Sequence, residues 1–229
     1  AVIIPGDELS EGQFPLRNYG LSIGILGNIW ILDFRLEYRN FNGTYKPSFF
    51  GPNYDRDRYG YAAQLTQELT NPKEIIPTVG IYGEAGFAIG DKFYLEAGYM
   101  WPWTPGSDQI DESLLGAPGE NDELHLKAIL EKGLIPVLDI HGSFTYDRTN
   151  LVPTLMGEGI PENLTVLQAL FDANTSMSGE VVYPVAEMLD VAILVTTNIA
   201  QDENGEPIIA ENGMPEISPS ISIETRLHF

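Results

Sequence analysis

The stretch WILDFRLEYR at residues 30–39 alternates between apolar and charged side chains from Leu32 onward. Successive side chains of a β-strand point to opposite faces of the sheet, so this stretch predicts a strand with two contrasting faces. The apolar face holds Trp30, Leu32, Phe34, Leu36 and Tyr38, and the charged face holds Asp33, Arg35, Glu37 and Arg39. Soluble sheets usually offer scattered Thr, Ser and Lys to water. A strand with lipid on one side and a wet lumen on the other has the pattern seen here.

The last ten residues, SISIETRLHF at 220–229, repeat the alternation and stop on an aromatic side chain. One face carries Ile221, Ile223, Thr225, Leu227 and Phe229, and the other carries Ser222, Glu224, Arg226 and His228. This ending resembles the C-terminal strand of bacterial outer-membrane β-barrel proteins. The resemblance is specific over these ten residues and diffuse elsewhere. It implies that Leu227 and Phe229 are an assembly signal read by the barrel-assembly machinery. It also implies a location in the outer membrane of a Gram-negative envelope, in contact with lipid and lipopolysaccharide or an equivalent.

Composition excludes several other classes of protein. The 229 residues suffice for one large all-β domain, which we expect to span 1–229. With 12 Lys plus Arg against 33 Asp plus Glu, the net charge is −21, which argues against nucleic acid as a partner. The absence of cysteine excludes disulfides and Cys-ligated metals. There is no run of eighteen apolar residues, so no transmembrane helix is predicted, but a spanning strand needs only about 9–11 residues.

Alternation of period two recurs along most of the chain. From Tyr19 onward it predicts nine strands, the further ones lying near 79–87, 93–101, 124–131, 138–147, 177–186 and 190–199. Bacterial single-chain barrels usually have an even strand number. Residues 1–5 could supply a tenth strand, although 1–18 could equally be a first-strand stub and loop. We therefore expect an antiparallel, up-and-down transmembrane β-barrel of about ten strands. It is either a processed mature chain or the C-terminal part of a larger barrel.

The connections between strands alternate in length. Short turns are expected at 27–28, 90–91, 132–136 and 187–190, and long connections at about 42–75, 102–121, 150–175 and 201–217. Outer-membrane barrels have short periplasmic turns and longer extracellular loops, and this assignment leaves Phe229 on the periplasmic side. Residues 59–69 fit a strand or a helix, and a helix keeps every short turn on one side. Residues 162–174 predict a short amphipathic helix in the third long connection.

Charged residues on the inner face of the strands predict a network across the lumen. Its expected members are Asp33, Arg35, Glu37, Arg39, Glu84, Glu96, Lys127, Glu131, Glu224 and Arg226. Cross-strand ion pairs contribute only about 0.2–1 kcal/mol each, but in a narrow barrel they fill the interior. A plugged or very narrow barrel and a selective small pore both fit this pattern.

Acidic residues concentrate in three of the long connections, which contain no Lys or Arg. These residues are Asp108, Asp111, Glu112, Glu120, Asp122 and Glu123 in the first, Glu158, Glu162 and Asp172 in the second, and Asp202, Glu203, Glu206, Glu211 and Glu216 in the third. Such loops would attract divalent cations and repel anions at a membrane face. The simpler interpretation is that they are solvated surface loops, and no calcium-binding loop is predicted.

Two histidines, His125 and His141, form a candidate site. A hairpin centred near residue 134 would place His125 opposite residues 141–143 and would gather on one inner face His125, Asp139, His141 and Ser143. Two imidazoles and a carboxylate could hold zinc or copper, and Ser143 with a His and an Asp could form a hydrolytic set. We expect instead ordinary polar groups in a wet lumen, with no metal, no cofactor and no catalytic residue.

Aromatic residues favour a membrane girdle. Tyr99, Trp101 and Trp103 cluster at one end of a predicted strand, and Tyr38 with Phe41 does the same. An aromatic core of a soluble β-sandwich is the alternative.

The expected function is therefore an integral outer-membrane protein, not an enzyme, with an anchoring, surface-exposed or structural role. It would have a narrow, charge-filled lumen, and an envelope protein is a possible partner. The alternative is a small, porin-like, cation-leaning passive channel with acidic extracellular loops.

Overall fold

The structure, a computed structural model, describes residues 19–42, 78–103, 122–133, 139–157, 160, 165–200, 202, 208–209 and 215–227. The chain divides into two compact units. Of the described residues, the first unit holds 19–25, 36–42, 78–82 and 101–103, and the second holds the remainder. Every strand contributes residues to the second unit, so the order of the sheet can be followed within it.

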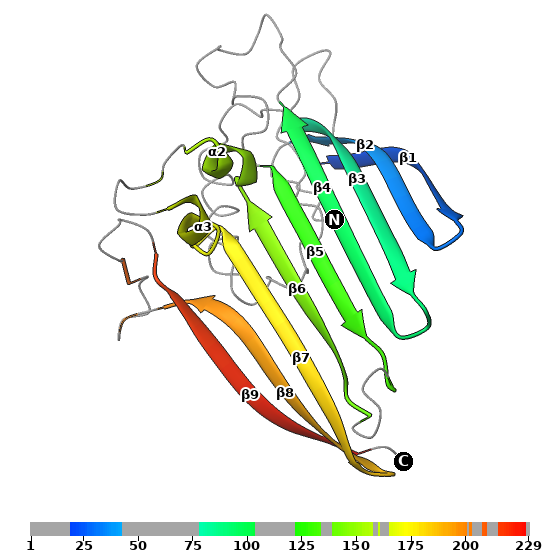
Figure 1. The fold of residues 1–229 in the computed structure, drawn as a ribbon. Helices are drawn as coiled ribbons and strands as arrows, with labels where there is room; N and C mark the ends of the chain where they lie inside the picture. The colour runs from blue at the N-terminus through cyan, green and yellow to red at the C-terminus, as the bar shows by residue number, and fades with distance from the viewer. Residues whose placement is uncertain are drawn as a thin grey trace, which may run out of the picture. The chain divides into compact units, whose positions relative to one another are not determined.

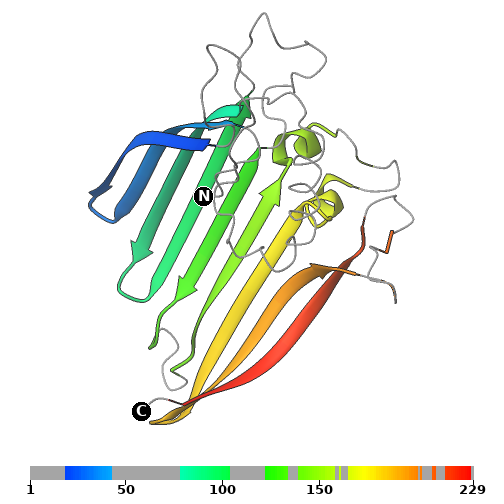
Figure 2. The same ribbon diagram turned by 180° about the vertical axis from the view of Figure 1, so that it is seen from behind.

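The described residues form an all-β, antiparallel, up-and-down sheet of nine strands in the order β1 to β9. The strands are β1 (Tyr19–Ile29), β2 (Leu32–Asn42), β3 (Thr78–Ile89), β4 (Phe93–Trp103), β5 (Glu123–Leu130), β6 (His141–Thr149), β7 (Thr175–Ala186), β8 (Leu189–Ile199) and β9 (Ile217–Leu227). Figures 1 and 2 show β5 to β9 side by side in this order, from the two sides. The nine strands expected from Tyr19 onward are thereby confirmed.

The expected count of about ten strands differs from the nine that the structure describes. The candidate tenth strand at residues 1–5, the candidate helix at 59–69 and most of the acidic loop residues lie outside the described part of the chain. In the sheet order, β1 and β9 are the two end strands.

Cross-strand register separates the side chains of β4 to β9 into two faces. One register row carries Glu96, Lys127, Thr145, Ser178, Thr196 and Ser220. The next row carries Leu95, Ala128, Phe144, Gly179, Val195 and Ile221. Because adjacent rows point to opposite sides of a sheet, we call these sides the charged face and the apolar face.

Strand order and strand bounds confirm that the connections alternate in length. The turns at 30–31, 90–92 and 187–188 and the connection at 131–140 join consecutive strands at one end of the sheet. The connections at 43–77, 104–122, 150–174 and 200–216 join strands at the other end. Leu227 lies opposite Leu189, directly beside a short turn, so the chain leaves β9 at the short-turn end.

The position of the first turn was predicted wrongly. Residues 27 and 28 lie within β1, and the chain reverses at Trp30 and Ile31 instead. The Asn28 amide donates a hydrogen bond to the Asp33 carboxylate, and Gly27 lies against the ring of Phe34. These cross-strand contacts extend the hairpin beyond the Gly-Asn pair, and they leave Trp30 at φ 60° and fully exposed.

Two short helices lie in the connection between β6 and β7. Within the described residues 165–174, the amphipathic helix expected at 162–174 is present as α3 (Val166–Ala169). The helix α2 (Leu151–Leu155) was not predicted. In Figure 1, α2 lies near the end of β6 and α3 near the start of β7.

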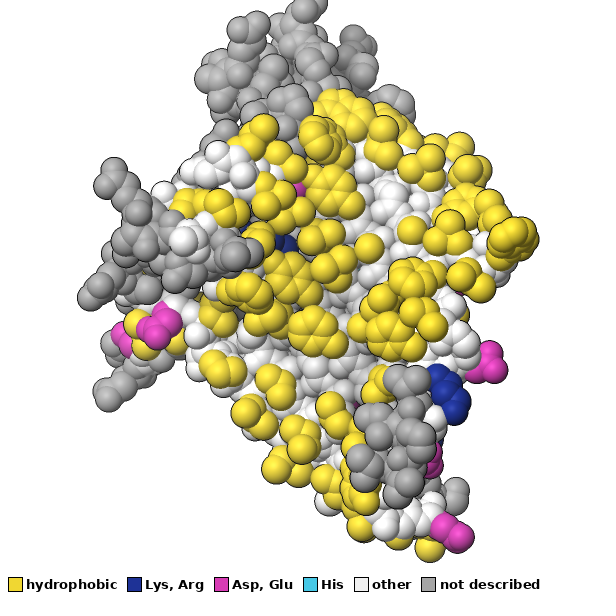
Figure 3. All heavy atoms as spheres, in the orientation of Figure 1, with side chains coloured by type: hydrophobic (Ala, Val, Ile, Leu, Met, Phe, Trp, Pro, Cys, Tyr) yellow, Lys and Arg dark blue, Asp and Glu magenta, His cyan; other side chains and the backbone are white. Residues whose placement is uncertain are grey.

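Burial in the sheet is the reverse of that in a water-soluble domain. On the apolar face of β8, Ile193 and Val195 are 45% and 40% exposed, and many other large apolar side chains are exposed as well. Figure 3 shows hydrophobic side chains spread over β5, β6 and β7 in the orientation of Figure 1. By contrast, Val182 and Ala192, which pair on the charged face, are buried. The apolar residues that blurred the sequence pattern of β7 and β8 therefore form a small packed core among the polar side chains.

Candidate functional site

The predicted charge network is present on the charged face as several local clusters. On β2 and β3, Arg35 Nε lies 4.0 Å from the Glu84 carboxylate. In the first unit, Arg39 binds the Glu37 carboxylate at 2.8 Å, and its guanidinium lies 3.7 Å above the centre of the Tyr82 ring. The two arginines of β2 therefore interact with side chains of β2 itself and of the neighbouring strand β3, through ion pairs and a cation–π contact.

The second cluster surrounds His125 on β5. Its Nδ1 lies 2.5 Å from Oδ1 of Asp147, the residue opposite it on β6. Its Nε2 lies 3.5 Å from Oε1 of Glu96 on β4. Glu96 also accepts a hydrogen bond of 3.1 Å from the hydroxyl of Tyr94. The imidazole of His125 therefore lies between two carboxylates from the neighbouring strands and is hydrogen-bonded to that of Asp147.

The third cluster links β9 to β7 across the intervening strand β8. Arg226 on β9 donates two hydrogen bonds, of 3.0 and 2.8 Å, to the two carboxylate oxygens of Glu180 on β7. The same guanidinium contacts Glu224 at 3.1 Å. Arg226 and Glu224 are predicted members of the network, but Glu180 is not, because its apolar neighbours obscure the alternation of β7.

The other predicted members of the network occupy separate positions. Asp33 binds Asn28 within the first hairpin, and Lys127 lies opposite Glu96 and Thr145 in the register. Glu131 is exposed just after β5, where its backbone N–H donates to the carbonyl of Lys92. The predicted assembly signal consists of Leu227 and Phe229. Leu227 is 62% exposed, and Phe229 lies outside the described residues.

The predicted gathering of the two histidines is wrong. His125 on β5 lies opposite Asp147 on β6. His141 is six residues before Asp147 on β6 and lies opposite Val182 on β7. The partner of His125 lies four residues beyond the expected partners at 141–143, so the register differs from that of a hairpin centred near residue 134. Ser143 lies opposite Ile129, four residues along β5 from His125, and Asp139 precedes β6. The residues of the alternative metal pair and hydrolytic set are therefore not brought together, and the described residues contain no cluster of acids and histidines able to hold a metal.

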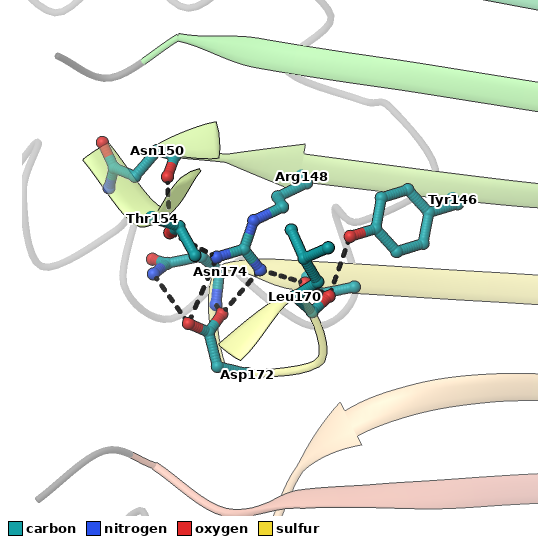
Figure 4. Close-up of polar contacts among 8 residues, drawn as sticks. Tyr146, Arg148, Asn150, Thr154, Leu170, Asp172 and Asn174 are labelled. Carbon is teal, nitrogen blue, oxygen red and sulfur yellow. Dashed lines mark hydrogen bonds and ion pairs between the residues drawn. The ribbon is translucent and has the colours of Figure 1, made fainter. Parts of the chain in front are cut away.

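A buried polar cluster on the apolar face was not predicted at all. Arg148 lies in register with Leu124 and Thr175, so it belongs to the apolar face, yet it is only 1% exposed. Its guanidinium binds Asp172 at 3.0 and 3.3 Å, Thr175 at 2.6 Å and Thr154 at 2.7 Å (Figure 4). One signal in the sequence could have revealed this cluster: Arg148 places a charge on the strand face that otherwise carries Phe144 and Tyr146.

A buried acid, Asp122, holds the start of α2. Asp122 is 0% exposed and accepts hydrogen bonds from the Tyr99 hydroxyl at 2.6 Å and from the Val152 N–H at 3.1 Å. Asp122 and Asp172 were both assigned to solvated acidic loops. The structure corrects this interpretation for both residues, because each is held by donors from neighbouring elements.

The aromatic residues at the long-connection end behave in two ways. In the first unit, the rings of Tyr38 and Trp103 lie 6.5 Å apart, as expected for clustered aromatics. Trp101 is 41% exposed, whereas Tyr99 is engaged with Asp122.

Comparison with known proteins identifies no relative: no family model, no curated protein and no solved structure matches the chain. Within the described residues, no helix has the length and apolar character needed to cross a bilayer.

Proposed function

We propose that this protein is an integral β-barrel of the bacterial outer membrane with an anchoring, surface-exposed or structural role and a narrow, charge-filled lumen. The observation that carries the proposal is the reversed burial of the sheet. On β7 and β8, the apolar-face residues Val181 and Ile193 are 49% and 45% exposed, whereas Val182 and Ala192 on the charged face are buried. The charged side chains of that face bind one another.

Water disfavours this arrangement. Exposed apolar surface costs about 25 cal/mol per Å² relative to burial, and contiguous apolar patches of this kind mark contact surfaces. Acyl chains remove that cost over the whole apolar face at once. Hydrocarbon also requires every backbone polar group to be paired. The proposal therefore requires that β1 and β9 be paired in the membrane, either with each other or through further strands.

Orientation follows from the alternation of connection lengths. The short turns would lie in the periplasm and the long connections at the cell surface. Leu227 and Phe229 would then lie at the periplasmic end, as an assembly signal for the barrel-assembly machinery. Lipid and lipopolysaccharide would contact the apolar face.

Site-directed spin labelling tests the proposal directly. The chain contains no cysteine, so single-cysteine variants of the full chain carry one nitroxide each. After reconstitution into lipid vesicles, labels at Ile221 and Ile223 should collide mainly with oxygen, which partitions into hydrocarbon. Labels at Ser220 and Ser222 should collide mainly with a water-soluble nickel complex. Equal or inverted accessibility of the two pairs would overturn the proposal.

A cation-leaning channel is the second candidate. The observation that favours it is an excess of carboxylates over basic side chains on the described charged face, around Glu84, Glu96, Asp147 and Glu180. Purified protein in planar bilayers separates the two candidates, because cation-selective conductance steps support a channel and electrical silence supports a closed structural barrel. If steps occur, Glu96→Gln should lower the cation preference, and Ser222→Ala provides a neutral control on the same face.

A further inference from the structure

Arg148 occupies a position that the proposed function makes unusual. On β6, Phe144, Tyr146 and Arg148 share the apolar face, and Phe144 is 48% exposed. An uncovered arginine on that face would meet acyl chains, which disfavour a charge. Arg148 is instead covered, and the residues that cover it belong to the connection between β6 and β7.

We call these covering residues, 150–157 and 165–174, the cap. Two sets of contacts hold the cap against the apolar face. Near α2, the N–H groups of Asn150 and Val152 donate to the backbone and side chain of Asp122. Near α3, the Tyr146 hydroxyl donates to the carbonyl of Leu170 at 2.8 Å (Figure 4). The cap is thus attached to the sheet on both sides of Arg148.

The cap has an apolar outer surface of its own. Leu155 and Met156 are 54% and 74% exposed, and Phe171 is 58% exposed while its ring edge meets Tyr146 at 6.2 Å. Asp172 is the only charged residue among the described residues of the cap, and its carboxylate is bound to Arg148. The surface therefore continues the apolar face past the strand ends without adding an exposed charge.

We infer that the cap is a lipid-contacting element that lies at the headgroup level of the bilayer and shields Arg148 from the acyl chains. The inference rests on the proposed function, because it assigns lipid as the partner of a surface that adjoins the proposed membrane face. Lipid is favoured because the exposed cap side chains are apolar and the surface is continuous with that face. The Arg148–Asp172 pair holds the cap in place.

Three spin labels test this placement in full-length protein reconstituted in phosphatidylcholine–phosphatidylglycerol vesicles. They are carried by the single-cysteine variants Phe171→Cys on the cap, Ile223→Cys on the apolar face and Ser222→Cys on the charged face. The ratio of oxygen to nickel-complex collisions should be highest at 223, lowest at 222 and intermediate at 171. Leu155→Cys, on α2, should behave like the label at 171.

The outcomes separate the two proposals. If the label at 223 is not protected from nickel, the proposed function fails. If it is protected but the label at 171 is as open to nickel as the label at 222, only the cap inference fails. A label at 171 that meets neither reagent would indicate a protein partner or a second copy on the cap, which also overturns the inference.

Arg148→Met in the Phe171→Cys background tests the holding contact. Loss of the Asp172 pair should release the cap, increase label mobility and shift the collision ratio toward that of residue 222. Thr154→Val, which removes one hydrogen bond, is the milder variant and should give a smaller shift in the same direction. Arg226→Met removes an arginine from the charged face and should leave the label unchanged. An unaltered spectrum in both cap variants would show that Arg148 does not hold the cap.

Discussion

Arg226 on β9 reaches across β8 and binds Glu180 on β7 through two parallel hydrogen bonds of 3.0 and 2.8 Å. The residues opposite Arg226 and Glu180 on β8 are Asp190 and Leu194, so the pair spans a complete strand. Such bidentate pairs are the strongest ion pairs available to arginine. This one ties the last strand of the described order to a strand that it does not hydrogen-bond through its backbone.

Glu180→Gln should therefore lower the free energy of unfolding by about 1 kcal/mol, since both side chains remain partly exposed and solvent screens the pair. A double-mutant cycle with Arg226→Gln, measured by denaturant titration of the reconstituted protein, isolates the coupling. The matched cycle of Glu224→Gln with Arg226→Gln should give a smaller coupling because Glu224 is more exposed. Equal couplings would contradict this account of the bidentate geometry.

Lysine substitutions on adjacent residues of β9 discriminate between lipid and water at the apolar face. Ile223→Lys should destabilise the reconstituted protein by about 2–4 kcal/mol, the cost of a lysine on the lipid face near the bilayer centre. Ser222→Lys, on the opposite face, should cost much less. The free energy of unfolding of both variants is the measurement, and a neutral Ile223→Lys would show that water covers this face.

Asp122 lies in a connection between strands, yet we expect it to stabilise the fold more than an exposed acid in such a connection does. Asp122→Ala leaves the Tyr99 hydroxyl and the Val152 N–H without their acceptor, which should cost about 3 kcal/mol. Tyr99→Phe removes one partner and should cost about 1 kcal/mol. Glu131→Ala, an exposed acid at the other end of β5, should change stability by less than about 0.5 kcal/mol. Denaturant titration of the three variants gives the ranking, and a stability of Asp122→Ala equal to that of Glu131→Ala would refute it.

Two glycines in neighbouring strands should differ in their tolerance of a methyl group. A Cβ added at Gly142 would lie 2.2 Å from the backbone oxygen of Glu180, whereas one added at Gly179 would lie 3.6 Å from the nearest atom, in the ring of Phe144. Gly142→Ala should therefore displace β7 and cost about 1–3 kcal/mol, while Gly179→Ala should be tolerated. Comparison of the two unfolding free energies checks this, and similar values would show that the strands can separate without cost.

Several features of the fold were predictable because they depend on local pattern. The side-chain period of a strand is two, so the alternation in 30–39 and 220–229 predicts both the strands and their contrasting faces. Chain length between strands likewise predicts which ends carry short turns. The charged members of the network were found on the same grounds, and Glu180 was missed where apolar neighbours such as Val182 interrupted the pattern.

Register was not predictable from the same pattern. The alternation around Gly27 and Asn28 fits a turn there or three residues later, and the contact of Asn28 with Asp33 selects the later one. The register of β5 and β6 likewise depends on the length of the intervening connection, which brings His125 to Asp147 and separates it from His141.

Period-two alternation alone was sufficient to identify an all-antiparallel sheet with one apolar and one charged side, because each strand carries that information within its own residues. Partner choice required the folded chain: Arg148 meets Asp172 and Thr154 only because β6, β7 and the cap converge in space. A buried charge is stabilised by whichever donors and acceptors surround it, and residues distant in the chain supply them here. For this reason a charge that looks misplaced in the linear pattern becomes a fixed contact of the tertiary structure.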